Sequence, residues 1–167
     1  MRETYNFTDS SYDGLVKDNS LFGGLGMLTD GHLAPADYAN TRGVGWIGWN
    51  AEDTPDPYIR FQFLNTRIFH SVTIHCNVRD EADVQLFSNV TIRFGEDVAT
   101  FDKSLSFKPK QISSGLGWKN YNVTIDLCKH VGKFMELKFT HVGNWILISE
   151  ISFNSGKFLC FFFERHI

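Results

Sequence analysis

Many of the glycines and several acids lie in the first fifty residues, where they could support acid–base catalysis or metal binding. Asp30-Gly31-His32 places a carboxylate two residues from an imidazole, and enzymes use both groups as general acids and bases. No nucleophile with an orienting partner stands beside them, so we expect no catalysis. The loop region carries Asp9, Asp13, Asp30 and Asp37 among its acids. Calcium takes such carboxylates together with carbonyl oxygens, but composition alone favours acids that cap turns and stay hydrated.

A further acid, Glu150, stands in the almost wholly apolar run from Trp145 to Phe153. An ionised carboxylate in a buried strand is costly unless it is paired or bound to a metal. Arg60, Arg93 or a bound cation could supply the opposite charge. A β-bulge at Ser149-Glu150 would aim both side chains outward. The sequence therefore makes this corner a candidate polar site.

The elements that must position these groups are β-strands. Polar and apolar side chains alternate with period two in short runs rich in Val, Ile, Thr and Phe, with polar or glycine-containing turns between them. The runs are Ile59–Phe63, Val72–Cys76, Val90–Phe94, Leu105–Lys108, Val123–Leu127 and Met135–Phe139, followed by Trp145–Phe153. This pattern predicts an all-β, antiparallel two-sheet sandwich. We expect the first fifty residues to form long ordered loops at one end of it, with one short strand near Trp46–Trp49.

Composition excludes several classes of function. The chain has 167 residues, of which 43% are hydrophobic, and this suits one globular domain. Its formal net charge is -3 without a basic stripe, so we expect no nucleic-acid partner and no insertion into a membrane. The first five residues lack the apolar core of a signal peptide, and no apolar run is long enough to span a bilayer.

Three Asn-x-Ser/Thr triplets mark candidate glycosylation sites. They begin at Asn6, Asn89 and Asn122. Together they favour a secreted or extracellular context, in which such triplets are acceptors. The same triplets also suit ordinary strand positions, because Val and Thr favour strands. Both interpretations of Asn89 and Asn122 stay open.

Several of these segments, taken in order, resemble one family. They are Ser11-Tyr12-Asp13-Gly14, Gly23-Gly24-Leu25-Gly26-Met27-Leu28-Thr29-Asp30-Gly31, Ile47-Gly48-Trp49-Asn50, Gly143-Asn144-Trp145 and Ser149-Glu150-Ile151-Ser152-Phe153. In combination they resemble the second, discoidin-like extracellular domain of the discoidin domain receptors, the collagen-activated receptor tyrosine kinases. The resemblance implies a jelly roll of the discoidin and galactose-binding type over residues 5–154. The tail 155–167 lies outside it and is either non-family sequence, from read-through or an isoform end, or a genuine C-terminal strand.

The resemblance implies a calcium ion (Ca2+) in the loops. Side-chain oxygens would come from Asp30 and Glu150, with Met27, His32 and Ser149 as further ligands largely through backbone carbonyls. Asp9 falls where the family has a glycosylated Asn, and it completes the expected ligand set.

The resemblance also bears on cysteine pairing. Vertebrate members join two strands by a disulfide at positions that match Ile92 and Leu137 here. Both cysteine positions of that disulfide are therefore aliphatic in this chain. The chain has three cysteines, Cys76, Cys128 and Cys160, which allow at most one internal bridge. Cys76 matches a family cysteine expected to be a buried free thiol. A Cys76–Cys128 bridge could also form, although the resemblance does not imply it.

The function implied is structural and regulatory. The domain would support and orient an adjacent collagen-binding discoidin domain on the extracellular face of the plasma membrane, and it would meet collagen only indirectly. That domain, a transmembrane helix and a kinase would belong to the parent receptor, whereas the chain as given would be a secreted or wrongly assembled product. The alternative is a stand-alone lectin-like jelly roll that stacks sugars or binds peptide through Trp46, Trp49 and Trp118.

Overall fold

The computed structural model describes residues 6–8, 15–17, 20–22, 25–97 and 99–157. The longer strands are β4 (Ile47–Asn50), β5 (Tyr58–Val78), β6 (Asn89–Gly95), β7 (Lys103–Phe107), β8 (Lys119–Thr140) and β9 (Trp145–Lys157). The shorter elements are β1 (Asn6–Thr8), β2 (Leu15–Lys17), β3 (Ser20–Phe22), the 3-10 helices η1 (Leu25–Thr29) and η2 (Asp80–Ala82), and α1 (Tyr38–Thr41). The all-β prediction is confirmed, and the short strands β1 to β3 add to the loops expected there.

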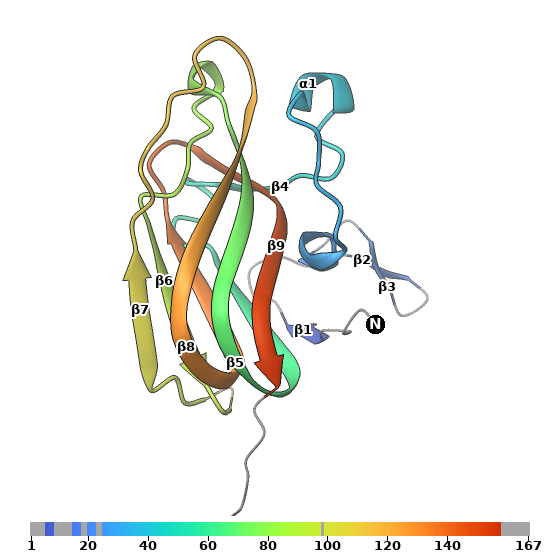
Figure 1. The fold of residues 1–167 in the computed structure, drawn as a ribbon. Coiled ribbons are helices and arrows are strands. Elements are labelled where there is room, and N and C mark those ends of the chain that lie inside the picture. The colour runs from blue at the N-terminus through green and yellow to red at the C-terminus, as the bar shows by residue number, and fades with distance from the viewer. Residues whose placement is uncertain (1–5, 9–14, 18–19, 23–24, 98, 158–167) are drawn as a thin grey trace, which may run out of the picture.

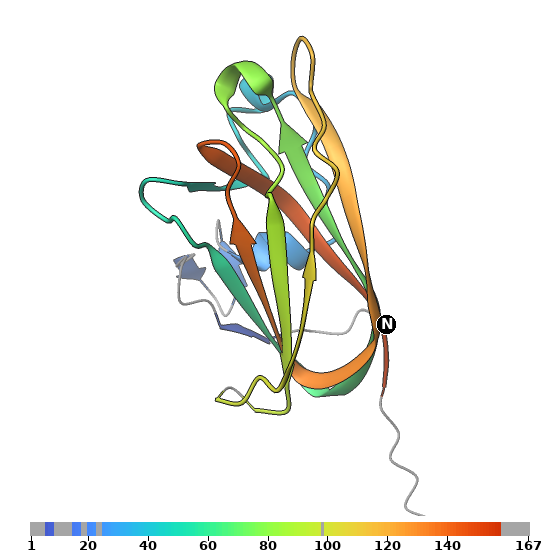
Figure 2. The same cartoon turned by 90° about the vertical axis from the view of Figure 1, so that its left-hand side faces the viewer.

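One curled antiparallel sheet forms both layers of the sandwich, in the order β4-β9-β5-β8-β6-β7 with β1 beside β5 (Figure 1). The long strands β5 and β8 run through both layers. In one layer residues 58–62 of β5 pair with the end of β8, which also pairs with β6. In the other, residues 71–78 of β5 lie between the start of β8 and β9. Figure 2 shows both strands curving from one layer into the other.

Each of these two strands unites two of the predicted runs. The runs at 59–63 and 72–76 both belong to β5, and those at 123–127 and 135–139 both belong to β8. Register shifts between Gln62 and Arg67 and between Phe69 and Ser71 mark the bend. A bulge bends a strand and increases its twist without ending its pairing. The interpretation of these runs as separate short strands was therefore wrong, because each pair of runs belongs to one continuous strand.

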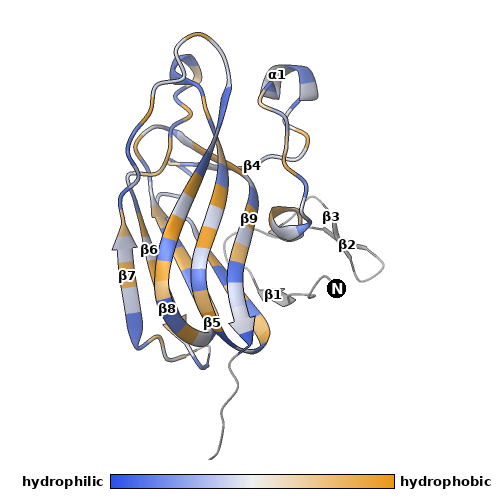
Figure 3. Cartoon of the chain, in the orientation of Figure 1, coloured by the Kyte–Doolittle hydropathy of each residue, from blue (hydrophilic) through white to orange (hydrophobic). Residues whose placement is uncertain are grey.

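The core lies between the layers and follows the predicted alternation. Ile59, Phe61 and Phe63 are at most 1% exposed, whereas the alternate residues of β5 face outward. Hydrophobic and hydrophilic residues alternate along β5 and β8 in Figure 3. Ile92 and Leu137 are both fully buried and lie directly opposite each other in β6 and β8. They therefore form the contact pair expected for two positions that match a disulfide.

Strand β9 extends to Lys157, where its last residues Ser155–Lys157 pair with Arg67–Phe69 of β5. The Arg67 guanidinium donates to the Ser155 hydroxyl at 2.8 Å and to the Ser155 carbonyl at 3.0 Å. Strand β9 therefore continues three residues past the predicted boundary at residue 154. Residues 158–167 lie outside the described residues.

Candidate functional site

A β-bulge in β9 creates the polar corner that the sequence predicted. His75 of β5 pairs with Glu150, but Cys76 pairs with Ile148, so Ser149 is the extra residue. Ser149 is 1% exposed and Glu150 is 7% exposed. The predicted bulge is therefore present. It aims both side chains away from the main core, but a loop covers them and they do not reach solvent.

The segment that covers the bulge includes η1 and the residues that follow it. The Gly31 N–H donates to Glu150 Oε2 at 3.2 Å, and the Ala34 N–H donates to Ser149 Oγ at 3.3 Å. Leu28 of η1 is fully buried in the main core, which anchors the start of this segment. Backbone donors are thereby matched to the two buried oxygens, as burial of polar groups requires.

Two asparagines clamp the rest of this segment to the outer face of β5 and β8. Asn77 Nδ2 donates to the Ala36 carbonyl at 3.0 Å and to Asn120 Oδ1 at 2.9 Å. Asn120 Nδ2 donates to the Ala34 carbonyl at 2.9 Å. Trp46 Nε1 donates to the Pro35 carbonyl at 3.1 Å. The carbonyls of residues 34–36 are thus all held, and we call this arrangement the asparagine clamp.

Sequence reasoning missed the asparagine clamp. Asn77 lies one residue before the end of β5 and is completely buried, although Asn is depleted in strands. That conflict between residue type and position was the available signal. It identifies a side chain whose amide has to be satisfied by a specific partner.

The expected calcium ligands come together only in part. Asp30 is adjacent to Gly31, whose N–H contacts Glu150, so both carboxylates lie at one corner. Asp30 Oδ1 accepts the His32 N–H at 2.7 Å, and the His32 ring lies outward with an 80% exposed side chain. Met27 packs against the core. Asp9 lies outside the described residues.

This donor set is chemically suited to a hard cation. Glu150, Asp30 and Ser149 offer oxygen atoms, which calcium prefers. Among residues 25–97 and 99–157, no group of three or more His, Cys, Asp and Glu side chains is arranged as a metal cluster. A cation at this corner would therefore depend on backbone carbonyls as well as on the two carboxylates.

The arginines considered as partners of Glu150 belong to another acid. Arg60 donates to Glu136 Oε2 through Nη2 at 2.6 Å and Nε at 3.2 Å, and Arg93 donates to Oε1 at 3.0 Å. The Phe101 ring packs against both guanidinium groups, 5.2 Å and 4.8 Å from its centroid. The prediction that Arg60 or Arg93 neutralises Glu150 was wrong, because register places Glu136 between these two arginines in the other layer.

The tryptophans considered for sugar stacking are mostly internal. Trp46 is 8% exposed and stacks on His75, and Trp49 is 2% exposed in the main core. Trp118 stacks on Tyr38 with ring centroids 4.9 Å apart, and Arg79 lies over its ring. Trp46 and Trp49 are therefore packing residues, and they do not offer the exposed rings that the lectin-like alternative would require.

The cysteines of the predicted bridge are both free, Cys76 buried and Cys128 exposed. Cys76 lies opposite Tyr121, and Cys128 follows seven residues later along the same strand. At about 3.3 Å per residue this separates them by roughly 20 Å, beyond the reach of a disulfide. The Cys76–Cys128 bridge is therefore not formed, whereas the expected buried thiol at Cys76 is present.

The glycosylation triplets occupy strand positions. Asn6 begins β1, and Asn89 contacts Thr91 and Ser106 through its side-chain amide. Asn122 is exposed, and its Oδ1 lies 2.5 Å from His75 Nδ1. Their modification stays a prediction.

The curled sheet with a loop-covered outer face defines a jelly roll of the discoidin and galactose-binding type. The same fold occurs in the fucose binding module SpX-3 of Streptococcus pneumoniae, with a TM-score of 0.59 and 16% identity over 93% of this chain and 96% of that chain. It also occurs in the lectin domain of Lectinolysin complexed with Lewis B antigen, with a TM-score of 0.52 and 11% identity over 91% of this chain and 92% of that one. Likeness at these identities shows the fold alone.

The family is shown by sequence. The family model described as "Discoidin domain-containing receptor 1/2, DS-like domain" matches residues 1–155, and the chain belongs to this family. It is 29% identical over 163 residues to the epithelial discoidin domain-containing receptor 1 of Mus musculus, covering 90% of this chain and 17% of the relative. It is 26% identical over 171 residues to the discoidin domain-containing receptor A of Caenorhabditis elegans, covering 98% and 21%. The chain thus spans about a fifth of the length of these curated relatives.

The match confirms the resemblance found in the sequence. In the described part of the chain, no helix combines the length and apolar character needed to cross a bilayer.

Proposed function

We propose that this domain is a non-catalytic extracellular module of a collagen-receptor tyrosine kinase. In that setting it supports and orients a neighbouring collagen-binding discoidin domain and takes part in receptor regulation. The observation that carries this proposal is the clamping of residues 31–36 onto the outer face of β5, β8 and β9. A segment held by so many specific hydrogen bonds fixes the shape of one surface, which suits a spacer. The family match supplies the receptor context.

Calcium would stiffen the same corner in this proposal. Glu150 and Asp30 would contribute carboxylate oxygens and Ser149 would contribute an oxygen at the bulge, while Met27 and His32 would contribute backbone carbonyls. The ion would offset the negative charge of a carboxylate that is only 7% exposed, where charge is costly. Metal binding would therefore couple to the stability of the loop-covered corner.

Removal of calcium tests this site. We expect EDTA to lower the melting temperature, because a ligand bound only by the native state stabilises it by about 2.7 kcal/mol at a hundredfold excess over Kd. For a domain of this size that corresponds to roughly 5–10 °C. Glu150→Gln should abolish the difference between calcium and EDTA, whereas Asp102→Asn, at an exposed acid outside this corner, should retain it. Equal melting curves for the wild type in calcium and EDTA would refute the calcium site.

Collagen binding tests the supporting role. The isolated domain should be retained only weakly on immobilised collagen, because the proposed contact with collagen is made by the neighbouring domain. A two-domain receptor ectodomain is the positive control. Tight retention of the isolated domain would show that it binds collagen itself and would overturn the proposal.

A further inference from the structure

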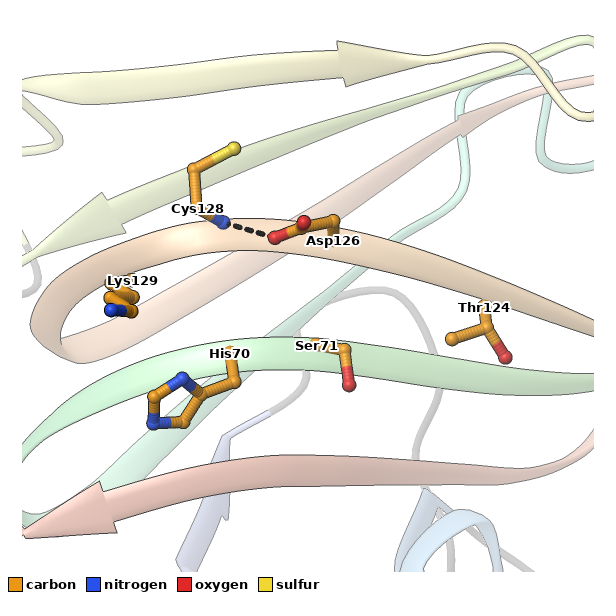
Figure 4. Close-up of a pocket in the computed structure, with 6 residues that line it drawn as sticks. All are labelled: His70, Ser71, Thr124, Asp126, Cys128 and Lys129. Atoms are coloured by element: carbon orange, nitrogen blue, oxygen red, sulfur yellow. Dashed lines mark hydrogen bonds between the residues drawn. The ribbon is translucent and has the colours of Figure 1, made fainter.

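A hollow lies where β5 and β8 bend from one layer into the other, away from the loop-covered corner. It is an open cavity of about 660 Å³ lined by His70, Ser71, Thr124, Asp126, Cys128 and Lys129 (Figure 4). Thr124 belongs to the triplet that begins at Asn122, and Cys128 was considered only for a disulfide. None of the lining residues belongs to the proposed calcium site.

The hollow is produced by paired irregularities in both strands. His70 has no partner in the register of β5 with β8 or with β9, which resumes at Ser71 on both sides. Opposite it, Cys128 and Lys129 of β8 have φ values of 52° and 57°. Residues with a Cβ atom seldom adopt this left-handed backbone conformation. Each such residue raises the free energy of the folded state by on the order of 1 kcal/mol.

The strained backbone is held from both sides. On the outer side Asp126 Oδ1 accepts the Cys128 N–H at 2.7 Å (Figure 4). On the inner side Leu127 is fully buried, and the His130 ring stacks on Phe94 with centroids 4.6 Å apart. Because Leu127 and His130 fix the bend, the side chains on its outer surface keep a defined arrangement.

These side chains offer both donors and acceptors around one hollow. The Lys129 ammonium donates, the Asp126 carboxylate accepts, and the Ser71 and Thr124 hydroxyls do both. Within the described residues, no hydrogen bond or ion pair engages the side chains of His70, Ser71 or Lys129. Polar groups converging on a concave surface are the usual means by which a protein orients a small ligand.

The balance of charge selects the class of ligand. Lys129 and Asp126 cancel formally, so the hollow has no net charge to attract an ion, and a carboxylate on one wall disfavours an anion. A ligand with adjacent hydroxyl groups can donate to Asp126 and accept from Lys129 at once. We propose that this hollow is a low-affinity binding site for a neutral saccharide, which is recognised through hydrogen bonds to Asp126, Lys129 and Ser71.

Amide chemical shifts of the 15N-labelled domain test the proposal. Methyl glycosides of galactose, fucose and N-acetylglucosamine are titrated to millimolar concentrations, and sodium sulfate is titrated separately. At least one glycoside should shift the amides of Ser71, Thr124 and Lys129 in a saturable way. Ser71→Ala and Lys129→Asn should each weaken binding about tenfold, which is the loss of one good hydrogen bond. Asn tolerates the left-handed backbone at residue 129, so the bend is kept.

Ser152→Ala is the matched control, because Ser152 lies on the same outer face in β9 without lining the hollow. It should bind as the wild type does. The proposal is overturned if no glycoside shifts these amides, or if the shifts persist unchanged in Ser71→Ala and Lys129→Asn. Shifts confined to the loop end near Trp118 and Trp145 would also overturn it, and a response to sulfate alone would assign the hollow to anions.

Discussion

Replacing Ile92 and Leu137 together with cysteine should install a disulfide between β6 and β8. The two residues are directly opposite in the antiparallel register and are fully buried. Opposed residues in such a ladder have Cα atoms about 4.5–5.5 Å apart, within the range that a disulfide spans. The resemblance to vertebrate members places a disulfide at these positions, so the backbone is expected to accept it without strain.

The gain and the loss can both be estimated. The bridge closes a loop of about 45 residues, which the chain-entropy treatment converts to about 4 kcal/mol of stabilisation. Shortening two buried aliphatic side chains to cysteine costs about 1–2 kcal/mol each, less than truncation to alanine because the sulfur fills part of the space. The reduced variant should therefore be about 2–4 kcal/mol less stable than the wild type. The oxidised variant should equal the wild type or exceed it by up to about 2 kcal/mol.

Urea unfolding with and without reductant measures this difference. Cys128→Ser and Cys160→Ser in the background prevent competing bridges. Val90→Cys with Leu137→Cys is the control, because Val90 lies opposite Phe139 and a diagonal pair is about 7–8 Å apart, too far for a relaxed bridge. The reasoning is refuted if Ile92→Cys with Leu137→Cys does not oxidise, or if oxidation leaves the unfolding midpoint unchanged.

Three further perturbations address other parts of the molecule. Burial raises the pKa of the Cys76 thiol, so DTNB should leave Cys76 unmodified until the protein unfolds. Cys128 is exposed and should be labelled in the native protein. Labelling of Cys76 in the native protein would contradict its burial. A hydrogen bond from Ser113 lowers the pKa of Asp80, whose contribution to stability is therefore present at neutral pH and lost as the pH falls through that lowered pKa. Asp80→Asn should accordingly melt below the wild type at pH 7 and match it in acid, and a constant gap across this pH range would count against the assignment. Glu136→Gln removes the carboxylate charge that two arginines share, and it should lower the free energy of unfolding in urea by about 2–4 kcal/mol. The loss should be smaller than for a fully buried pair, because both arginines are partly exposed. A loss below about 0.5 kcal/mol would show that the network contributes little to stability.

The alternation of Phe, Ile and Val predicted the strand faces, because a residue's neighbours in a strand fix which side it presents. It did not predict that residues 64–70 would continue β5 through a bend, since bulged residues break the period of two that identifies a strand. The Ser149-Glu150 bulge, in contrast, could be predicted because the residue types themselves indicate it. There an acid interrupts an apolar run, and only a local break in pairing lets both side chains leave the core.

Residues of the candidate site could be predicted where their type conflicted with their neighbours in the sequence. Their hydrogen-bond partners, which are far away in the sequence, could not be predicted. Glu150 stood out among apolar neighbours, and Asn77 could have been noticed in the same way. Their partners Gly31 and Ala36 are ordinary loop residues that contribute only backbone groups. Any residue has those groups, so sequence composition carries no signal for them.

The outer face of β8, β5 and β9 changes in character along its length. Near one end Asn77 and Asn120 hold the covering segment, and the next outward residue of β5, His75, pairs with Glu150. Thr73 and Thr124 follow, with their hydroxyls 3.0 Å apart, and Thr124 begins the lining of the hollow that continues to Asp126. A ligand in the hollow would therefore meet a surface that is already fixed, and its binding should leave the asparagine clamp and the proposed calcium corner in place. Addition of EDTA during the glycoside titration tests this independence, since an unchanged Kd is expected and a large change would show that the two ends of the face are coupled.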